Sequence, residues 1–381
     1  MSDPAKKYKN YLAPEAIVWV NGRKLSKDAL SFSNLKVDMV IDGADTFSFT
    51  LSDAFDMQEM KPKRASEFSF GDIVEIHIGY ADNRESKESL PILFKGVVTS
   101  IGWNFSQNGY LEINVEGKDF SFLMMKHKFR RKEGDEASWN DRSDPDVVRE
   151  VFESTYKRVF SANGVVIDSE GSPVREQIRH KEESDYAFFA SLAQRNGYEF
   201  FVQRDRFYFR KPPKKSKGEI SLRYGKEILS FNPEFSVEKQ VSKVRVVGLE
   251  FGPDKKRITA EAPEGKSDTA EASTSALKEL LKDLNNIEYE IRAPVESVEA
   301  AKRLADSKYK ELSSGLMRAQ LVTVGIPELK PGIYVNLEGL GSRFSKPYYI
   351  AKAVHTFGSG GYETSLELRN DSFKLTKGGG G

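Results

Sequence analysis

Residues 70–76 of this chain read FGDIVEI, and residues 331–337 read PGIYVNL. Each stretch has a glycine at its second position and continues as a strand. Two more strand-like stretches follow each of them: FKGVVTSI at 94–101 and NGYLEINV at 108–115 in the first case, YYIAKAV at 348–354 and GGYETSLEL at 360–368 in the second. Self-similarity at so large a separation predicts two copies of one small β unit, with other material inserted between them.

Two related units in one chain have a geometric consequence. Three such chains would present six similar units around one axis. That number is what a protein needs if it joins a three-fold object to a six-fold one.

Composition limits the class of protein. The chain has 381 residues and a mass of 43.0 kDa, with 39% hydrophobic and 30% charged residues and a net charge of +1. This length predicts more than one domain, and the near-zero charge gives no support for a nucleic acid or an anionic membrane as partner. Cysteine is absent, which excludes disulfides, thiolate metal sites and a Cys nucleophile and fits assembly in a reducing cytosol. Residues 1–10 do not resemble a signal peptide, and no apolar run approaches the roughly 20 residues of a membrane-spanning helix.

The expected fold class is mixed β and α+β, with two related small β-barrel domains, an α+β insert and a helical insert. Short alternating strands with turn residues between them predict small closed or nearly closed barrels, because closure removes exposed strand edges. The predicted parts are an N-terminal segment (1–15), a first β-barrel (16–130), the α+β insert (131–218), a second β-barrel (219–252 and 316–374), a loop and helical insert (253–315) and a flexible tail (375–381).

Helix signals lie in the two inserts. In the first, N-cap residues precede apolar stripes at 146–156 and 184–196, and Gly197 is the expected C-cap of the second helix. Strands are expected at 165–168, 198–202 and 206–209. In the second insert a stronger helix is expected at 296–313 and a weaker one at 274–286, whereas the polar stretch 253–276 predicts a mobile loop.

Few residues carry chemistry. The four histidines (His77, His127, His180 and His355) form no HExxH motif and no i, i+4 pair. His180 lies in a charged stretch that we expect to be exposed, and His355 lies in a strand pattern where a structural hydrogen bond is expected. Nucleophile-elbow, Walker and strand-linked GxGxxG motifs are absent. We therefore expect no catalytic, cofactor-binding or metal-binding residues, no cofactor and no enzyme activity.

Two basic runs, at 126–132 and 211–217, have two interpretations. They could contact phosphates or an acidic partner, or they could be solvated linkers beside a domain. The second interpretation is favoured because neither run is interleaved with aromatic residues as a single-strand binding groove requires. No sequence-specific nucleic acid binding is expected.

Residues 353–370 read AVHTFGSGGYETSLELRN, and this closing segment closely resembles that of the phage late control gene D family. Members of this family are the tail hub proteins of contractile-tailed phages. The preceding elements are similar in order too: a helix with Ala300-Ala301, a strand opened by Pro331-Gly332 and a strand with Tyr348-Tyr349-Ile350. The resemblance extends from about residue 17 to residue 370.

The resemblance implies a structural baseplate hub of a contractile phage tail or a phage-tail-like injection particle. Such a hub is a homotrimer that adapts the hexameric tail tube protein to a trimeric spike protein, here expected to be a separate polypeptide, and it contacts other baseplate proteins. The implied location is the baseplate of the virion or particle, after assembly in the bacterial cytoplasm. The motif residues, expected to be structural, are Gly71, Gly109, Tyr110, Gly332, His355, Gly361, Tyr362 and Thr364.

A protein of another class remains open: a peptidoglycan- or carbohydrate-binding barrel module, with or without hydrolase activity. Such a module usually exposes aromatic residues in a groove. Trp19, Trp103 and Trp139 are widely separated in the sequence, which does not favour this class.

Overall fold

The computed structural model describes most of the chain. The described residues are 7–8, 11–25, 32–52, 55–56, 58–59, 61–62, 68–80, 90–105, 111–130, 136–214, 218, 220–236, 238, 241, 243–249, 257–263, 288–293, 295, 297–313 and 317–370. The expected helix at 274–286, the tail at 375–381 and the motif residues Gly109 and Tyr110 lie outside them.

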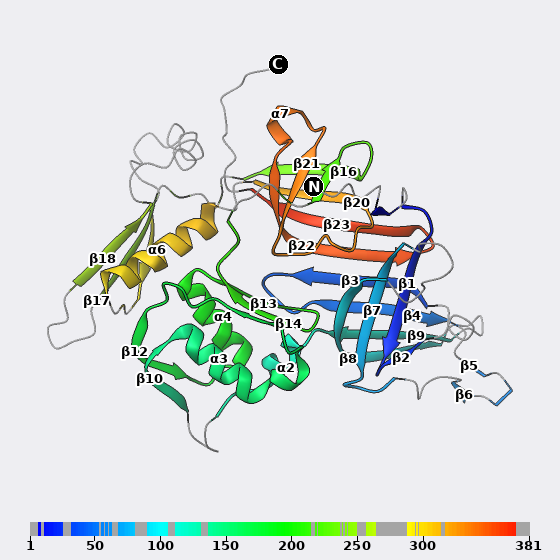
Figure 1. The fold of residues 1–381 in the computed structure, drawn as a ribbon, viewed down its shortest axis with the longest axis horizontal. Helices are drawn as coiled ribbons and strands as arrows, with labels where there is room; N and C mark the ends of the chain where they lie inside the picture. The colour runs from blue at the N-terminus through cyan, green and yellow to red at the C-terminus, as the bar shows by residue number, and fades with distance from the viewer. Residues whose placement is uncertain are drawn as a thin grey trace.

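One sheet of 13 strands runs through the protein (Figure 1). Its N-terminal strands are β1 (Pro14–Val20), β2 (Arg23–Lys24), β3 (Phe32–Val40), β4 (Thr46–Ser52), β7 (Ile73–Tyr80), β8 (Ile92–Phe105) and β9 (Leu111–Lys118). Its C-terminal strands are β15 (Ile220–Arg223), β16 (Ile228–Phe235), β20 (Met317–Val324), β21 (Tyr334–Glu338), β22 (Pro347–Gly358) and β23 (Gly361–Arg369). The N-terminal set is called unit 1 and the C-terminal set unit 2. The mixed β and α+β class is confirmed.

The two units have the same strand order. Unit 1 runs β3-β4-β9-β8-β7-β1, and unit 2 runs β16-β20-β23-β22-β21-β15. Numbered by position in the chain, and leaving aside the short β2, both orders read 2-3-6-5-4-1. The last pair differs, because β1 pairs with β7 antiparallel whereas β15 pairs with β21 in parallel. The repeat expected from the sequence is therefore present in the topology.

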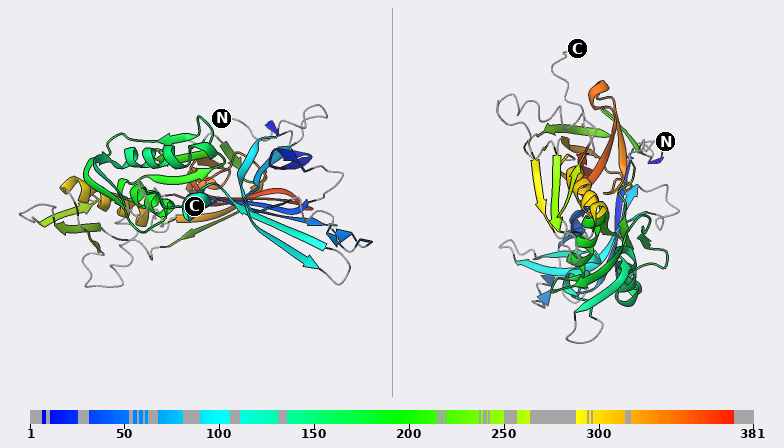
Figure 2. Two further views of the ribbon diagram at one scale, coloured as in Figure 1. Left: turned by 90° about the horizontal axis from the view of Figure 1, so that it is seen from below. Right: turned by 90° about the vertical axis from the view of Figure 1, so that its left-hand side faces the viewer.

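The sequence predicted two separate barrels, closed or nearly closed. The two units are instead joined in one sheet. The first residues of β22 pair with β21, and residues 352–357 of the same strand pair antiparallel with residues 35–40 of β3. Because β22 is long enough to pair with both strands, the sheet continues from unit 2 into unit 1 and curls without closing (Figure 2). No pairing between described strands closes either unit on itself.

Alternating side chains build a core for each unit. Strand β9 alternates buried and less buried positions along its whole length, and β20 does the same. In unit 1, Phe49 and Ile76 are fully buried with their neighbours, and in unit 2, Tyr348 is. The period-two pattern of the sequence thus marks the buried face of the sheet.

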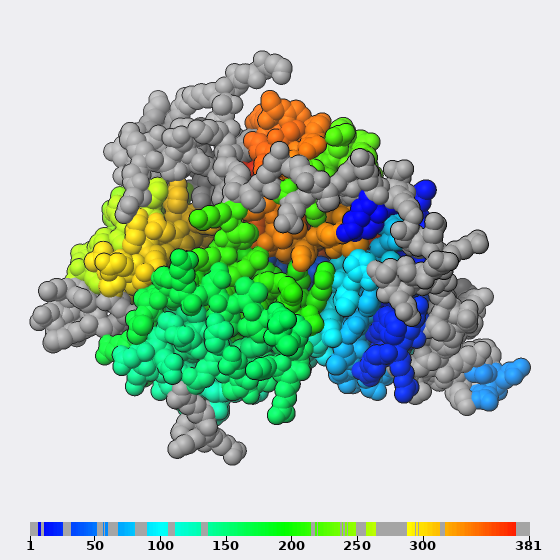
Figure 3. Space-filling view, in the orientation of Figure 1, coloured from blue at the N-terminus to red at the C-terminus, as the bar shows by residue number. Residues whose placement is uncertain are grey.

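The first insert has α+β structure, and it begins earlier than residue 131. It contains α2 (Ser121–Lys126), β10 (Ala137–Ser143), α3 (Asp144–Thr155), the 3₁₀ turn at Lys157–Val159, β11 (Val165–Ile167), β12 (Val174–His180), α4 (Asp185–Asn196), β13 (Glu199–Gln203) and β14 (Arg206–Arg210). Helix α2 was expected to belong to the first β-barrel, but its buried Met124 packs in the core of the insert. Ser143 and Ser184 cap the two longer helices, and Gly197 ends α4 in the left-handed conformation, as the sequence predicts. The pair β10–β12 was not expected. In Figure 3 this insert lies beside unit 1 on one face of the molecule.

The second insert begins earlier in the chain than expected. Strands β17 (Lys243–Leu249), β18 (Arg257–Ala262) and β19 (Glu288–Arg292) form their own three-stranded sheet, which α6 (Val298–Ser313) covers. Residues 244–247 therefore lie in this sheet and not in unit 2. Residues 257–262 are a strand and not a loop: their buried side chains are only isoleucine and alanine, so the stretch is too weakly apolar to show a strand pattern. The helix expected at 296–313 is confirmed.

Three small elements complete the described fold. Strands β5 (Phe55–Asp56) and β6 (Lys61–Pro62) pair with each other, and α7 (Gly341–Phe344) follows β21.

Candidate functional site

The glycines that mark the repeat occupy matching turns. Gly71 has a φ of +85° and Gly332 a φ of +86°, a conformation that favours glycine. The Gly71 N–H donates to the Val98 carbonyl at 2.9 Å, and the Gly332 N–H donates to the Ile350 carbonyl at 3.0 Å. In each unit the residue after the glycine accepts a bond back from the same partner residue. The two turns therefore share the glycine conformation and this pair of hydrogen bonds.

Three motif residues meet at His355, which is 1% exposed. Its Nε2 lies 2.8 Å from the Leu329 carbonyl, and its Nδ1 lies 2.9 Å from the Tyr362 hydroxyl and 3.1 Å from the Thr364 hydroxyl. Thr364 in turn accepts from the Ile326 N–H at 3.2 Å. Burial lowers the pKa of His355 to about 4, so the ring is neutral near pH 7. The cluster fixes the loop before β21 against the β22–β23 hairpin, where Gly361 has a positive φ.

The same cluster lies at the seam between the two units. Tyr80 of unit 1 donates from its hydroxyl to the Gly325 carbonyl of unit 2 at 2.8 Å. Its ring lies 6.0 Å from that of Tyr362 and 5.2 Å from that of Tyr8 in the N-terminal segment. Tyr8 also donates to the carboxylate of Glu328. Tyr362 is thus the member of the cluster that contacts Tyr80 of unit 1.

Two strand edges have no neighbour among the described strands, and they are the counterparts of the two strands that pair between the units, β22 and β3. Of the described strands, only β9 pairs with residues 100–105 of β8, whereas the matching half of β22 also pairs with β3. Strand β16, the counterpart of β3, pairs with β20 and with no other described strand, apart from a bridge of Ile228 to Tyr224. Among the described residues, large apolar side chains are exposed at both edges: Trp103 (45%) and Phe105 (66%) on β8 and Leu229 (51%) on β16. Exposed apolar strand edges of this kind are sites for pairing with another chain.

These edges could not be predicted from the sequence, because the exposure of a strand edge cannot be read from an alternating pattern of residues. One signal was present: β8 carries Trp103 and Phe105 at alternate positions beyond the length that β7 can cover.

The histidine expected to be exposed is buried instead. His180 Nε2 lies 2.7 Å from Asp185 Oδ1, and His127 Nδ1 lies 2.7 Å from Asp185 Oδ2. Asp185 also accepts from the Tyr156 hydroxyl and from the Phe129 N–H. Burial opposes ionisation of this carboxyl, but the hydrogen bonds outweigh it and hold its pKa below the usual range. These four bonds join the start of α4, where Asp185 lies, to the segment after α2, the end of α3 and the end of β12.

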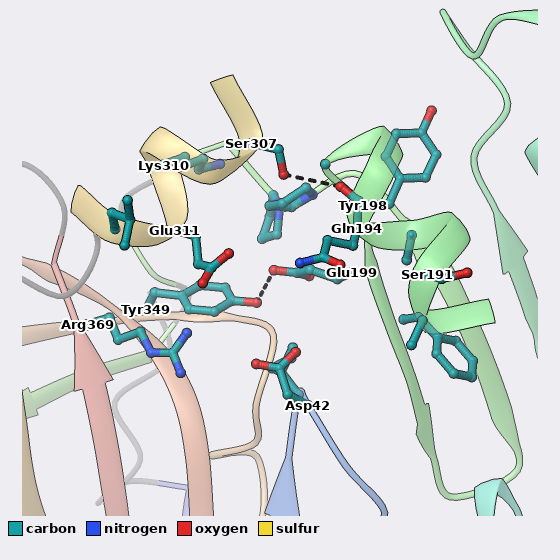
Figure 4. Close-up of a pocket in the computed structure, with 18 of the residues that line it drawn as sticks. Asp42, Ser191, Gln194, Tyr198, Glu199, Ser307, Lys310, Glu311, Tyr349 and Arg369 are labelled. Carbon is teal, nitrogen blue, oxygen red and sulfur yellow. Dashed lines mark hydrogen bonds between the residues drawn. The ribbon is translucent and has the colours of Figure 1, made fainter. Parts of the chain in front are cut away.

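A cleft of about 920 Å³ lies between α4, α6 and the strands of unit 2 (Figure 4). Glu199 and Tyr349 point toward each other in it, and the Tyr349 hydroxyl donates to the Glu199 carboxylate. Burial raises the pKa of Glu199, while Tyr349 and Arg210, whose Nε lies 3.4 Å from Oε2, oppose the rise. Ser307 of α6 donates to the Gln194 carbonyl of α4 at 3.2 Å. These groups connect the inserts with unit 2.

Among the described residues, no group of three or more His, Cys, Asp or Glu side chains is placed to hold a metal ion. No helix in the described part of the chain is long and apolar enough to cross a membrane. The tryptophans are dispersed: Trp19 lies against His77, Trp139 is buried in the core of the first insert, and Trp103 is on the open edge of β8.

Solved structures of phage tail and type VI secretion proteins share the fold of this chain. A 43 kDa tail protein of prophage MuSo2 from Shewanella oneidensis has a TM-score of 0.69 at 14% identity, over 93% of this chain and 98% of its own. A tail protein from Neisseria meningitidis MC58 has a TM-score of 0.69 at 13% identity, over 95% and 98%. A component of the E. coli type VI secretion system, described as structurally similar to T4 bacteriophage tail proteins, has a TM-score of 0.59 at 11% identity, over 95% and 79%. The chain therefore has a fold found in phage tail and type VI secretion proteins.

The family model that matches is described as the Alg8 N-terminal domain, and it covers residues 13–358. The chain belongs to this family. The matching model is thus not that of the late control gene D family, which the closing segment resembles. No curated protein matches the sequence.

Proposed function

We propose that this protein is the structural, non-enzymatic hub of a baseplate in a contractile phage tail or a related injection particle. Three copies would form a ring that adapts a hexameric tail tube to a trimeric spike, as the resemblance to the late control gene D family implies. Other baseplate proteins would contact the inserts. The tail and type VI secretion proteins that share the fold support this role.

The observation that carries the proposal concerns two pairs of strands. Strands β22 and β3 pair with each other inside the chain, through the second half of β22. In the repeat, β8 corresponds to β22 and β16 corresponds to β3, and neither β8 nor β16 has such a further neighbour among the described strands. We infer that β8 of one copy pairs with β16 of the next. Such a head-to-tail contact is heterologous and forms a ring when it closes.

The register of this contact follows from the matching bulges. The β8–β9 pair has an irregularity at Val98/Ser100 and the β22–β23 pair has one at Ile350/Lys352, so Asn104 corresponds to Thr356. Lys36 of β3 corresponds to Asn232 of β16. Lys36 pairs with Ser48 and Ser48 with Glu116, and in the same way Asn232 pairs with Gln320 and Gln320 with Glu367. Glu116 and Glu367 are themselves the partners of the matching residues Ser100 and Lys352.

Thr356 is the direct cross-strand partner of Lys36. Asn104 is therefore expected opposite Asn232 of a second copy. One step further along, Phe105 would lie opposite Phe231 of that copy, an aromatic pair worth roughly 0.2–1 kcal/mol. Pro233 corresponds to Val37, which faces β22 in a hydrogen-bonded pair because the Ile41 N–H of the same ladder donates to the Ala351 carbonyl. The contact between copies would therefore lack one ladder hydrogen bond, at Pro233.

The absence of cysteine allows a direct test. Asn104→Cys/Asn232→Cys should form disulfides between copies, so that a non-reducing gel of assembled particles shows covalent dimers and trimers of the 43.0 kDa chain. Lys36→Cys/Thr356→Cys is the matched control: it should form the equivalent disulfide within one chain and leave the mass of a monomer.

The stoichiometry is tested separately by the native mass of the hub. A covalent ladder that stops at three copies, and a mass of three chains, would support the proposal. If the control pair oxidises while the Asn104/Asn232 pair remains reduced in assembled particles, the inferred interface is wrong. A closed two-fold hub, or six identical copies, would refute the adaptor role.

A further inference from the structure

A second pocket, of about 430 Å³, lies on a different part of the molecule from the strand edges and from the cleft in Figure 4. Four parts of the chain form it: the start of β8, Ser161 after the 3₁₀ turn, the β13–β14 hairpin of the first insert, and the loop before β21. Most of the polar side chains that line it can donate hydrogen bonds: Lys95, Ser161, Gln203, Arg204, Arg206 and Lys330.

Three of these cations have no acidic partner among the described residues. Lys95 is paired with Glu75 at 2.8 Å, but Arg204, Arg206 and Lys330 form no ion pair with any described side chain. Asp205, in the same turn, and Glu328, whose carboxylate acts on both Arg204 and Lys330, supply two negative charges against the four cations. The pocket therefore has an excess of positive charge.

Arg204 is the most constrained member of the cluster. Its Nε is buried and has no hydrogen-bond partner in the described structure. Its backbone has a φ of +59°, a conformation that a residue with a Cβ adopts only at a cost. The β13–β14 turn thus keeps a guanidinium at the pocket although glycine would suit the backbone better.

The positive charges of this cluster also act on the pKa of the Lys330 side chain. Burial, and then the charges of Arg204, Arg206 and Arg210, lower its pKa to about 8. An anion placed among these side chains would offset their mutual repulsion, and its oxygens would accept the unused N–H groups.

We propose that this pocket binds an oxyanion group, of the phosphate or carboxylate type, through Arg204, Arg206 and Lys330. Guanidinium groups suit such oxygens because their planar N–H groups can bond two of them at once. The pocket is roomier than one such group requires, so the ligand carries the group on a larger body: a small polyanion, or an acidic side chain of a neighbouring protein. This inference does not depend on the proposed hub function.

The test uses the full chain at low ionic strength and two probes, inorganic pyrophosphate and the peptide acetyl-Glu-Glu-Glu-amide, in isothermal titration calorimetry. One probe molecule should bind per chain. Arg204→Gly and Lys330→Gln should each weaken binding about tenfold or more, because each removes charge-assisted hydrogen bonds. Arg204→Gly is informative because it relieves the positive φ and should fold at least as well as the wild type. Lys214→Gln, at an exposed lysine outside the pocket, removes one positive charge and should leave binding unchanged.

The two probes distinguish the sources of the oxyanion. Tighter binding of pyrophosphate would indicate a phosphoryl ligand, and tighter binding of the peptide would indicate carboxylates of a partner. In either case the pKa of Lys330, followed by NMR of labelled lysine, should rise on binding. The proposal is refuted if neither probe binds, or if both pocket variants bind as tightly as Lys214→Gln.

Discussion

The substitution His355→Gln is predicted to destabilise the protein at neutral pH and to remove part of its sensitivity to acid. The Leu329 carbonyl can only accept, so Nε2 of His355 carries the proton and Nδ1 accepts from the Tyr362 hydroxyl. Glutamine can replace the donor at Nε2 but has no atom at the position of Nδ1. His355→Asn is the complementary change, since it can keep the acceptor and loses the donor.

The expected loss near pH 7.5 is about 1–2 kcal/mol for each variant, which is the cost of one hydrogen bond and of one buried group left without a partner. At acidic pH the difference in stability between the wild type and the variants should become smaller. The pKa of His355 is lowered by burial to about 4, from an ordinary value of 6.5. The unfolded chain therefore binds a proton below pH 6.5 that the native protein binds only near pH 4, and the stability that the neutral ring provides above pH 6.5 is lost as the pH falls. At 1.36 kcal/mol per pKa unit the wild type loses about 2 kcal/mol by pH 5 through this residue.

Urea unfolding followed by tryptophan fluorescence and circular dichroism at pH 7.5, 6.5, 5.5 and 5.0 measures this difference. The variants should be less stable than the wild type at pH 7.5, and the difference should shrink and reach zero or change sign near pH 5. Other titrating groups act in all three proteins and cancel in the comparison.

A difference that stays constant across this range would refute the deduced neutral, buried imidazole. If the variants assembled and unfolded like the wild type while a hydrolytic activity of the purified protein was lost, the structural role of His355 would be wrong.

Three further perturbations test other parts of the fold. Asp144→Ala should cost about 3–5 kcal/mol in urea unfolding, because it removes the buried carboxylate that bonds the buried guanidinium of Arg175 at 2.9 Å; a loss below about 1 kcal/mol would contradict this. Gly332→Ala should destabilise more than Gly71→Ala, since both strain a positive φ but only at Gly332 would the new Cβ meet other side chains, the nearest at 2.7 Å; equal thermal shifts would show that the insert does not pack on this turn. Burial raises the pKa of Asp119 to about 7, so its contribution to stability is present below pH 4 and lost as the pH rises through 7. Asp119→Asn should therefore flatten the fall in melting temperature between pH 5 and 8, and an unchanged slope would exclude the raised pKa.

Much of the local structure follows from the sequence. The caps of α3 and α4 are local, since Ser143 and Ser184 accept bonds from N–H groups three residues ahead. The repeated glycine turns are local as well, because a positive φ at Gly71 and Gly332 depends on the missing Cβ. Predictions from the sequence were wrong where contacts within the folded protein, and not the local pattern of residues, determined whether a side chain is buried. His180 lies in a charged stretch, yet its partner Asp185 is brought to it by the fold and makes burial possible.

The candidate site could be found only in part. The sequence indicated His355, Tyr362 and Thr364 through the closing motif, and the structure brings them together at one cluster. It did not indicate the open edges of β8 and β16, or the cations around Arg204, because those residues come from strands and loops distant in the chain.

The sequence alone determined the alternation of the strands, the position of most helices and the existence of two copies of one β unit. These properties depend on side chains a few residues apart and on glycine, whose conformational freedom is intrinsic. The tertiary structure decided that the two copies join into one curled sheet, because pairing of β22 with β3 requires strands more than 300 residues apart to meet. It also decided which strand edges stay open. An edge is defined by the absence of a neighbour, and no pattern along a single strand records which neighbour is absent.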